Sequence, residues 1–263
     1  MTTVIYELRE HVAVLTLNRP ESLNALNLAM IDHLRASTER AAFDRQARAV
    51  LLQGAGDHFM AGGDIKWFRD QLALPPQERQ RRFEQVIADV HGSILALKGM
   101  GKPVVAAVQG AVAGFGMSLM MACDMVVAAD NAYFTLAYSN IALSPDGGAT
   151  WSLPRQVGLK QAMEIALLGE RFDAARAREL GLLNRVVAPE RLAGEALALA
   201  QRLASGPAAA FARTKALLNR SSETSLETQL QAEQHAFAAC GAEADFTEGL
   251  AAFFDRRPAS YHQ

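Results

Sequence analysis

The sequence has 263 residues, of which 50% are hydrophobic and 21% are charged, values that exclude disordered and collagen-like chains. Its 26 basic residues nearly balance its 28 acidic ones, so the basic surface that nucleic-acid binding requires is not expected. Two cysteines, Cys123 and Cys240, are too few for a disulfide framework. The first ten residues include Glu7 and Glu10 where a signal peptide has a basic end and an apolar core, and we expect a cytoplasmic protein.

The first third of the chain is predicted to alternate between strands and helices. Apolar runs at 12–17 and 49–53 predict two strands, and the helical spacing of apolar residues over 28–43 predicts a helix between them. This order is typical of a βαβ unit in a parallel sheet. Farther along, apolar side chains at 3.6-residue spacing predict an amphipathic helix over 78–98.

Residues 103–123 carry no charge and are numerous enough to span a bilayer. Glycines at 110, 114 and 116 follow a β-branched run at 104–108, however, and a helical apolar run begins only after them. We interpret this segment as a buried strand, a glycine turn and a buried helix inside a water-soluble core. No membrane association is expected.

The second half of the chain differs in character from the first. An apolar run at 124–129 predicts one more strand, and from Leu159 onward the pattern is alanine-rich and almost wholly helical. We therefore predict a sheet core followed by helices over the last 100 residues. The expected division is an α/β core at 1–190 and a helical part at 191–263.

Several kinds of site are missing from the sequence. There is no P-loop motif, no GxSxG nucleophile elbow and no complete dinucleotide fingerprint. The six histidines and two cysteines have no metal-ligand spacing, so we expect no metal and no cofactor. Among the histidines, His58 has the strongest claim to a functional role, because it lies in a glycine-rich loop.

Two glycine turns are the candidates that remain. They are FMAGGDIK at 59–66 and GAVAGFG at 110–116, the second of which opens a predicted helix. Each turn would leave backbone N–H groups free, and the helix adds the positive end of its dipole. Two such N–H groups that converge on one oxygen form an oxyanion hole, and glycine permits the close approach of backbone and ligand.

Both turns belong to a series of six motifs that covers nearly the whole chain. The series is LNRPESLNAL at 17–26, HFMAGGDIK at 58–66, KPVVAAVQGAVAGFGMSLMMACD at 102–124, PDGGATWSLPRQVG at 145–158, ARELGLLNRVV at 177–187 and DFTEGLAAFFDRR at 245–257. In this order it resembles the enoyl-CoA hydratase/isomerase (crotonase) family. The resemblance implies an α/β fold, a crotonase-like spiral of ββα repeats, with a C-terminal helical part that forms trimers or hexamers. It also implies an acyl-CoA substrate, so that coenzyme A arrives as part of the substrate.

The same resemblance assigns roles to individual positions. The backbone N–H groups of Gly63 and Phe115 match the family's oxyanion donors. Lys66 and Arg256 match basic residues near the nucleotide phosphates, with Arg256 reaching from a neighbouring subunit. The positions that match other coenzyme A contacts are Ser22, Leu23, Ala25, Ala61, Gly63, Asp64 and Ile65.

The catalytic carboxylates depart from the pattern of the family's hydratases. Those enzymes use two glutamates to position and activate water, and the matching positions here hold Ser118 and Tyr138, whose hydroxyls are poor bases at neutral pH. Asp146 matches the catalytic aspartate of family isomerases, including the enoyl and epoxide isomerases of phenylacetyl-CoA breakdown. An alternative is that Asp146 only caps the next helix, because Pro-Asp-Gly is common in turns.

We therefore expect an enoyl-CoA isomerase in which Asp146 moves a proton on an enolate, while Ser118 and Tyr138 shape the substrate pocket. One alternative is a hydratase-like enzyme. Another is an enzyme like the family's aryl-CoA dehalogenases, in which Asp146 would be a nucleophile. Those pair the aspartate with an indole where this chain has Tyr138. The last alternative is a non-catalytic relative that binds acyl-CoA.

Overall fold

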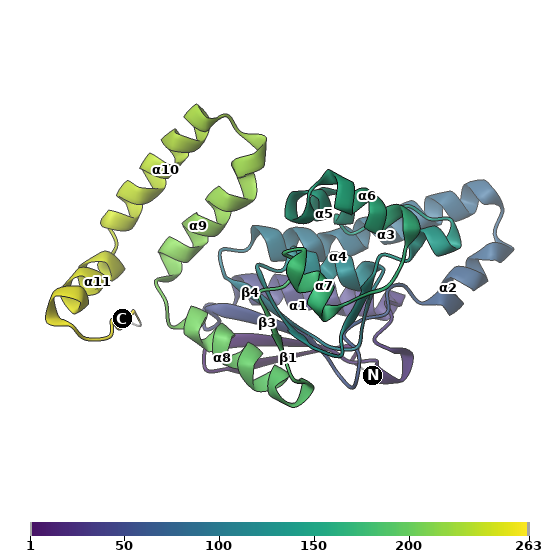
Figure 1. Ribbon diagram of the computed structural model, residues 1–263, viewed down its shortest axis with the longest axis horizontal. Helices are drawn as coiled ribbons and strands as arrows, with labels where there is room; N and C mark the ends of the chain where they lie inside the picture. The colour runs from purple at the N-terminus through teal and green to yellow at the C-terminus, as the bar shows by residue number, and fades with distance from the viewer. Residues whose placement is uncertain (1, 262–263) are drawn as a thin grey trace.

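The computed structural model describes residues 2–261 and contains a large and a small β-sheet with helices around them (Figure 1). In the large sheet the first two strands are antiparallel, and all other neighbours are parallel. Its spatial order is β1 (Val4–Arg9), β2 (Val12–Leu17), β3 (Ala49–Gly54), β4 (Val104–Val108), β6 (Met125–Ala129) and β9 (Arg185–Val187).

A strand of the small sheet follows closely after β4 and again after β6. The small sheet has the order β5 (Ala111–Ala113), β7 (Tyr133–Thr135) and β8 (Phe172–Asp173), and α4 (Phe115–Ala122) comes directly after β5. The loop after β3 joins the edge of this sheet through a bridge between Met60 and Val112. The predicted spiral of ββα repeats is therefore confirmed.

The central strands are buried on both faces, as their continuous apolar sequences predict. Alternate residues of β2 point to opposite sides, so that Ala13 and Leu15 join one core cluster while Val12 and Val14 join the other. The first cluster lies against α1 (Leu28–Phe43), α3 (Pro76–Gly99) and α4, and the second lies against α8 (Leu192–Ala204).

The remaining helices lie at the edges of this core. The α-helices are α2 (Ile65–Asp70), α5 (Ala149–Val157), α6 (Leu159–Leu168), α7 (Ala174–Glu179), α9 (Ala208–Arg220), α10 (Leu226–Gly241) and α11 (Ala244–Asp255). The short 3-10 helices are η1 (Pro20–Ser22), η2 (Gln71–Ala73), η3 (Tyr138–Ile141), η4 (Pro189–Arg191) and η5 (Ser221–Glu223).

The sequence predicted the long elements well and missed the short ones. The strand at 12–17 and the helix at 28–43 have the predicted bounds. The expectation of helices alone over the last 100 residues was wrong, because β8 and β9 lie there. These strands have two and three residues, too few for a period-2 pattern to be recognised. Among residues 2–261, no helix combines the length and the apolar character that crossing a membrane needs.

The last three helices extend away from the two sheets and form an arm (Figure 1). Helix α8, although it follows residue 190, packs against β3, β4 and β6 of the large sheet. The start of the arm is attached by the largely buried ammonium group of Lys215 on α9. Its Nζ lies 2.8 Å from a carboxylate oxygen of Asp124 and donates to the carbonyl oxygens of Leu97 and Lys102. The division of the chain near residue 190 stays a prediction.

Candidate functional site

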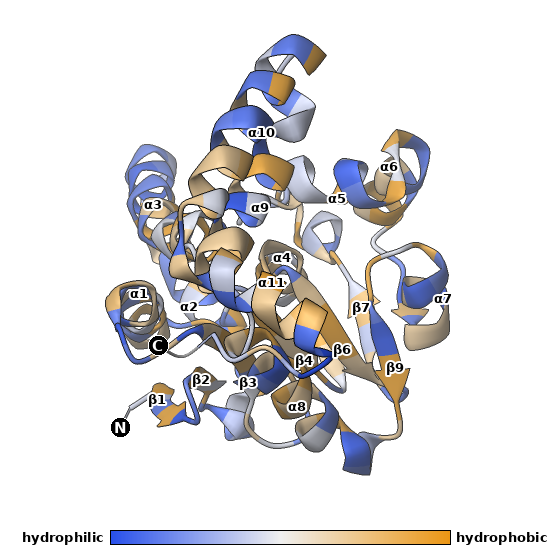
Figure 2. Ribbon diagram, turned by 90° about the vertical axis from the view of Figure 1, so that its left-hand side faces the viewer, coloured by the Kyte–Doolittle hydropathy of each residue, from blue (hydrophilic) through white to orange (hydrophobic). Residues whose placement is uncertain are grey.

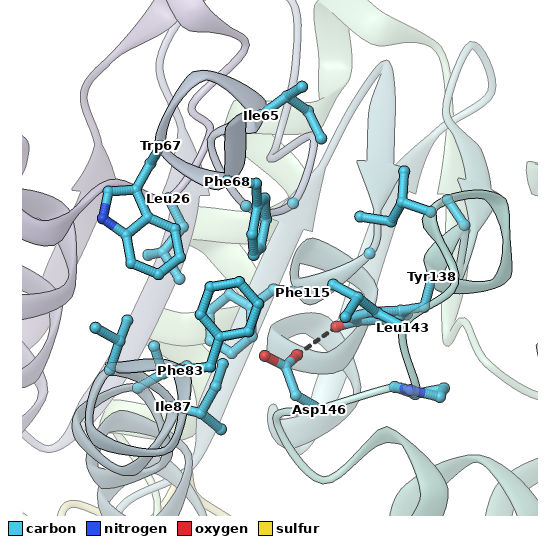
Figure 3. Close-up of a pocket in the computed structure, with 18 of the residues that line it drawn as sticks. Leu26, Ile65, Trp67, Phe68, Phe83, Ile87, Phe115, Tyr138, Leu143 and Asp146 are labelled. Atoms are coloured by element: carbon cyan, nitrogen blue, oxygen red, sulfur yellow. Dashed lines mark hydrogen bonds between the residues drawn. The ribbon is translucent and has the colours of Figure 1, made fainter. Parts of the chain in front are cut away.

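A mostly apolar cavity of about 530 Å³ lies between the glycine turns, α2, α3 and the loop that precedes α5 (Figure 3). Trp67, Phe68 and Phe83 pack together on one side, with ring centroids 5.3–5.7 Å apart. Tyr138 and Asp146 lie across the cavity from these rings (Figure 3). An apolar cavity with a few polar groups is typical of a small-molecule site.

The two predicted glycine turns meet in the wall of this cavity, with backbone against backbone. A Cβ atom on Gly62 would lie 3.1 Å from the carbonyl oxygen of Ala113 and 3.6 Å from the backbone nitrogen of Phe115. A Cβ atom on Gly116 would lie only 2.4 Å from the carbonyl oxygen of Met60. Glycine at both positions is therefore what allows the two turns to approach each other.

The approach brings the two candidate oxyanion donors to the same cavity. Gly63 and Phe115 both line it, and Phe115 is the first residue of α4. Within residues 2–261, neither backbone N–H donates to another backbone or side-chain group. Two free N–H groups, one of them at a helix N-terminus, are suited to an oxygen that carries negative charge.

The positions matched to coenzyme A contacts come from two segments that run side by side. Backbone N–H groups of Ala61 and Leu26 donate to the carbonyl oxygens of Leu23 and Gly62, at 3.0 and 2.8 Å. The guanidinium of Arg19 also contacts the carboxylate of Asp64 at 3.1 Å. The structure thus brings together the predicted positions Ser22, Leu23, Ala25, Ala61, Gly63, Asp64 and Ile65, of which Ala61, Gly63 and Ile65 line the cavity.

The two predicted basic residues lie in different places. Lys66 is exposed in the first turn of α2, next to Ile65 in the cavity wall. Arg256 ends α11 in the arm and does not line this cavity in its own chain. A role for Arg256 at the site therefore requires a second copy of the chain and stays a prediction.

Asp146, Tyr138 and Ser118 form one hydrogen-bonded group. The Tyr138 hydroxyl donates to Oδ1 of Asp146 (Figure 3). The Ser118 hydroxyl donates to the backbone carbonyl oxygen of Asp146 at 2.9 Å and lies 3.4 Å from the Tyr138 hydroxyl oxygen. The predicted base and the two residues expected to shape the pocket are therefore neighbours in space. Tyr138 and Asp146 line the cavity, whereas Ser118 is buried behind them and is not among the residues that line it.

The surroundings adjust the acidity of this group. Burial raises the pKa of the Asp146 carboxyl, and the hydrogen bond from Tyr138 opposes that rise, as does a positive charge on His91 when its imidazole is protonated. Burial, followed by the charge of Asp146 and its hydrogen bond, raises the pKa of Tyr138, so its hydroxyl stays protonated and donates at neutral pH. Of the two groups, Asp146 is the one that can act as a base.

The histidine that reaches the cavity is not the one that the sequence favoured. His58 accepts a hydrogen bond from the backbone N–H of Ala111 at 3.0 Å and does not line the cavity. His91, on α3, does line it and accepts from the backbone N–H of Gly147 at 3.4 Å. Nothing in the local pattern distinguishes His91 from other polar residues of an amphipathic helix, so sequence reasoning missed it.

Comparison with known proteins identifies the family. Residues 7–263 match the family model described as enoyl-CoA hydratase/isomerase. The chain belongs to the enoyl-CoA hydratase/isomerase family. A Rhodobacter capsulatus relative named a probable enoyl-CoA hydratase is 40% identical, over 97% of this chain and 96% of its own length.

Other relatives carry names for different reactions. The 1,2-epoxyphenylacetyl-CoA isomerase of Escherichia coli is 36% identical, over 98% of this chain and 97% of its own. The crystal structure of an enoyl-CoA hydratase from a Polaromonas species has a TM-score of 0.92 at 36% identity and covers 98% of this chain and 99% of its own. These names support an acyl-CoA enzyme of the family and do not distinguish isomerase from hydratase.

The buried carboxyl leads to a prediction about stability. A carboxyl whose pKa is raised on folding binds its proton more tightly in the folded state than in the unfolded chain. The folded state therefore loses stability as the pH rises from the unfolded-state pKa through the folded-state pKa of this group. Asp146→Asn removes this loss, and the Asn carbonyl oxygen can still accept from Tyr138. The melting temperature of the variant should therefore exceed that of the wild type at pH 7, by a margin that shrinks toward pH 4. A lower melting temperature at pH 7 would contradict this account.

Proposed function

We propose that this family member is an enoyl-CoA isomerase, which moves a carbon–carbon double bond of its acyl-CoA substrate through an enolate. The observation that carries the proposal is that Asp146 is the one carboxylate among the described residues that line the cavity. A 1,3-proton shift needs one group that removes a proton and returns it to another carbon. Hydration by two glutamates would need carboxylates where Ser118 and Tyr138 stand.

In this proposal the thioester oxygen binds the backbone N–H groups of Gly63 and Phe115. Negative charge grows on this oxygen as the enolate forms, so both hydrogen bonds strengthen at the transition state, and each contributes about 3 kcal/mol to lowering the barrier. The positive end of the α4 dipole lies at Phe115 and acts in the same direction. The acidity of the carbon next to the thioester rises as a result.

Asp146 then carries the proton. Its carboxylate takes a proton from the α carbon of a 3-enoyl thioester, the electron pair moves into a dienolate, and the same carboxyl returns the proton to the γ carbon. No atom is gained or lost, and the product is the conjugated 2-enoyl thioester. The hydroxyl of Tyr138 occupies Oδ1, which leaves Oδ2 for the transfer. A raised pKa helps, because both forms of the carboxyl then lie closer in energy at working pH.

The substrate is proposed to bind along the two adjacent segments that hold the predicted coenzyme A contacts and in the cavity next to them. The coenzyme A part would lie along positions 22–25 and 61–65, with Lys66 near its phosphates. The acyl group would enter the apolar cavity beside the aromatic rings of Trp67, Phe68 and Phe83. The hydratase alternative uses the same binding site, so only the reaction distinguishes the two.

Asp146→Asn is expected to separate chemistry from binding. Turnover of a 3-enoyl-CoA, followed by the absorbance of the conjugated product, should fall about 10²–10⁴-fold, the usual scale for a general base. The affinity for a saturated acyl-CoA should stay unchanged, because the carbonyl oxygen of Asn keeps the place of Oδ1. Asp130→Asn, in an exposed turn, is the matched control. An Asp146→Asn variant within threefold of wild type would show that Asp146 is only a turn residue.

Hydration provides the reciprocal test. With a 2-enoyl-CoA, the wild-type protein should accumulate no 3-hydroxyacyl-CoA, because no carboxylate stands at 118 or 138 to activate water. The double variant Ser118→Glu with Tyr138→Glu should gain hydration that chromatography can detect, while each single variant gains little. Ready hydration by the wild type would favour the hydratase alternative instead.

We also propose that the protein assembles as a trimer or as a dimer of trimers. Hydrophobic residues occur along the three helices of the arm (Figure 2). Several of their side chains are exposed, and a stable monomer would leave them in water. Light scattering should therefore give three or six times the mass of one chain, and a stable monomer would contradict both the assembly and a role for Arg256. The exposed residues are Leu218, Leu226, Leu230, Phe237, Phe246, Leu250, Phe253 and Phe254.

A further inference from the structure

The backbone directly after Asp146 is a turn of two glycines. Gly147 and Gly148 both have left-handed backbones, with φ of 59° and 75°. A Cβ atom on Gly147 would lie 2.8 Å from the ring of Phe115 and 2.9 Å from the Cβ of Ser118, so no other residue fits there. Two glycines allow this conformation without holding it, because their backbones are the least restricted of all residues. The backbone N–H of Ala149 closes the turn by donating to the carbonyl oxygen of Asp146 at 3.1 Å, and side chains from outside the turn add to this contact.

The peptide group between Asp146 and Gly147 is bound at both of its ends by side chains from two helices. The hydroxyl of Ser118, on α4, donates to the carbonyl oxygen of Asp146 at 2.9 Å. Nε2 of His91, on α3, accepts from the N–H of Gly147 at 3.4 Å. Ser118 is 1% exposed, so its hydrogen bond is formed away from water and adds to the one that the same carbonyl oxygen accepts from Ala149. The peptide group cannot rotate without breaking one of these two bonds.

We propose that His91 and Ser118 are a pair of positioning residues that hold the Asp146–Gly147 peptide group and thereby aim the Asp146 carboxylate at the substrate. The inference rests on the proposed function, in which Asp146 is the base. Ser118 donates a hydrogen bond to the carbonyl oxygen of Asp146. A glutamate at this position could not do so, because an ionised carboxylate has no proton to donate. Tyr138 then fixes the carboxylate end of the same residue.

The pairing specifies the chemical state of His91. A neutral imidazole accepts at one ring nitrogen and donates at the other, whereas the charged ring donates at both. His91 must therefore be neutral and carry its proton on Nδ1 while it accepts from Gly147. The carbonyl oxygen of a glutamine side chain reaches about as far as Nε2 and can accept in its place, and a leucine fills similar space without accepting.

The experiment compares His91→Gln, His91→Leu and Ser118→Ala in the full-length protein. His91→Leu and Ser118→Ala should each lower kcat for a 3-enoyl-CoA by about five- to thirtyfold, while KM stays within twofold, because small misplacements of a catalytic group reduce turnover rather than binding. His91→Gln should stay within threefold of wild type. Gln85→Leu, an exposed position on the same helix outside the cavity wall, is the control and should not change kcat.

The double variant His91→Leu with Ser118→Ala tests whether the pair acts as one unit. Its loss should be smaller than the product of the two single losses, because both bonds hold the same peptide group and the effects of such neighbouring contacts are not additive. Melting curves and the affinity for a saturated acyl-CoA show whether each variant is folded.

The outcomes separate this inference from the proposal on which it rests. If His91→Leu and Ser118→Ala keep wild-type kcat while Asp146→Asn is inactive, the positioning pair is wrong and the base assignment stands. If Asp146→Asn is also active, the proposed function itself fails. Equal losses in His91→Gln and His91→Leu would also overturn the inference, since accepting a hydrogen bond would then not be what His91 does.

Discussion

The loop after β3 and the turn before α4 pack backbone against backbone, and the geometry of the site depends on this contact. Gly116 leaves no room for a Cβ atom because the carbonyl oxygen of Met60 occupies that space, and Gly62 combines a tight contact to Ala113 with a left-handed backbone. The bridge between Met60 and Val112 fixes the register of the two turns. Gly63 and Phe115 consequently face one cavity although they lie far apart in the sequence, and the parallel strands behind them keep both turns in place.

Two features of its surroundings suit Asp146 to act as a base. Burial raises the pKa of Asp146, which favours a carboxyl that can both accept and return a proton. The hydroxyl of Tyr138, which stays protonated, limits that rise and orients the carboxylate. A buried carboxylate of this kind reduces the stability of the folded protein, and such a cost is expected where a group is kept for its reactivity.

The long, periodic elements of the fold are predictable from the sequence, whereas the short strands and the contacts of the site are not. The strand at 12–17 and the helix at 28–43 follow from periodic burial, which is a local property. The short strand at 185–187 does not, because its pairing with β6 depends on a distant partner. The neighbourhood of Ser118, Tyr138 and Asp146 could be expected only from the family resemblance, since their spacing alone indicates no contact.

His91 shows where sequence reasoning ends. It lies on one helix among many polar residues, and its partner is a backbone N–H that is 56 positions away. Lys215 is similar, because a lysine on an amphipathic helix gives no sign that it will reach Asp124 and two carbonyl oxygens of the core. Contacts between side chains and distant backbone groups leave no periodic trace, and the structure is needed to find them.

The central claim is that one carboxylate carries a proton between two carbons of the substrate. It is tested most directly with a 3-enoyl-CoA that carries deuterium on its α carbon, converted in ordinary water and examined by mass spectrometry and NMR. A single shuttling carboxyl predicts that part of the deuterium reappears on the γ carbon of the 2-enoyl product. A product that carries no deuterium on the γ carbon at the earliest times, or a 3-hydroxyacyl product, would contradict the account.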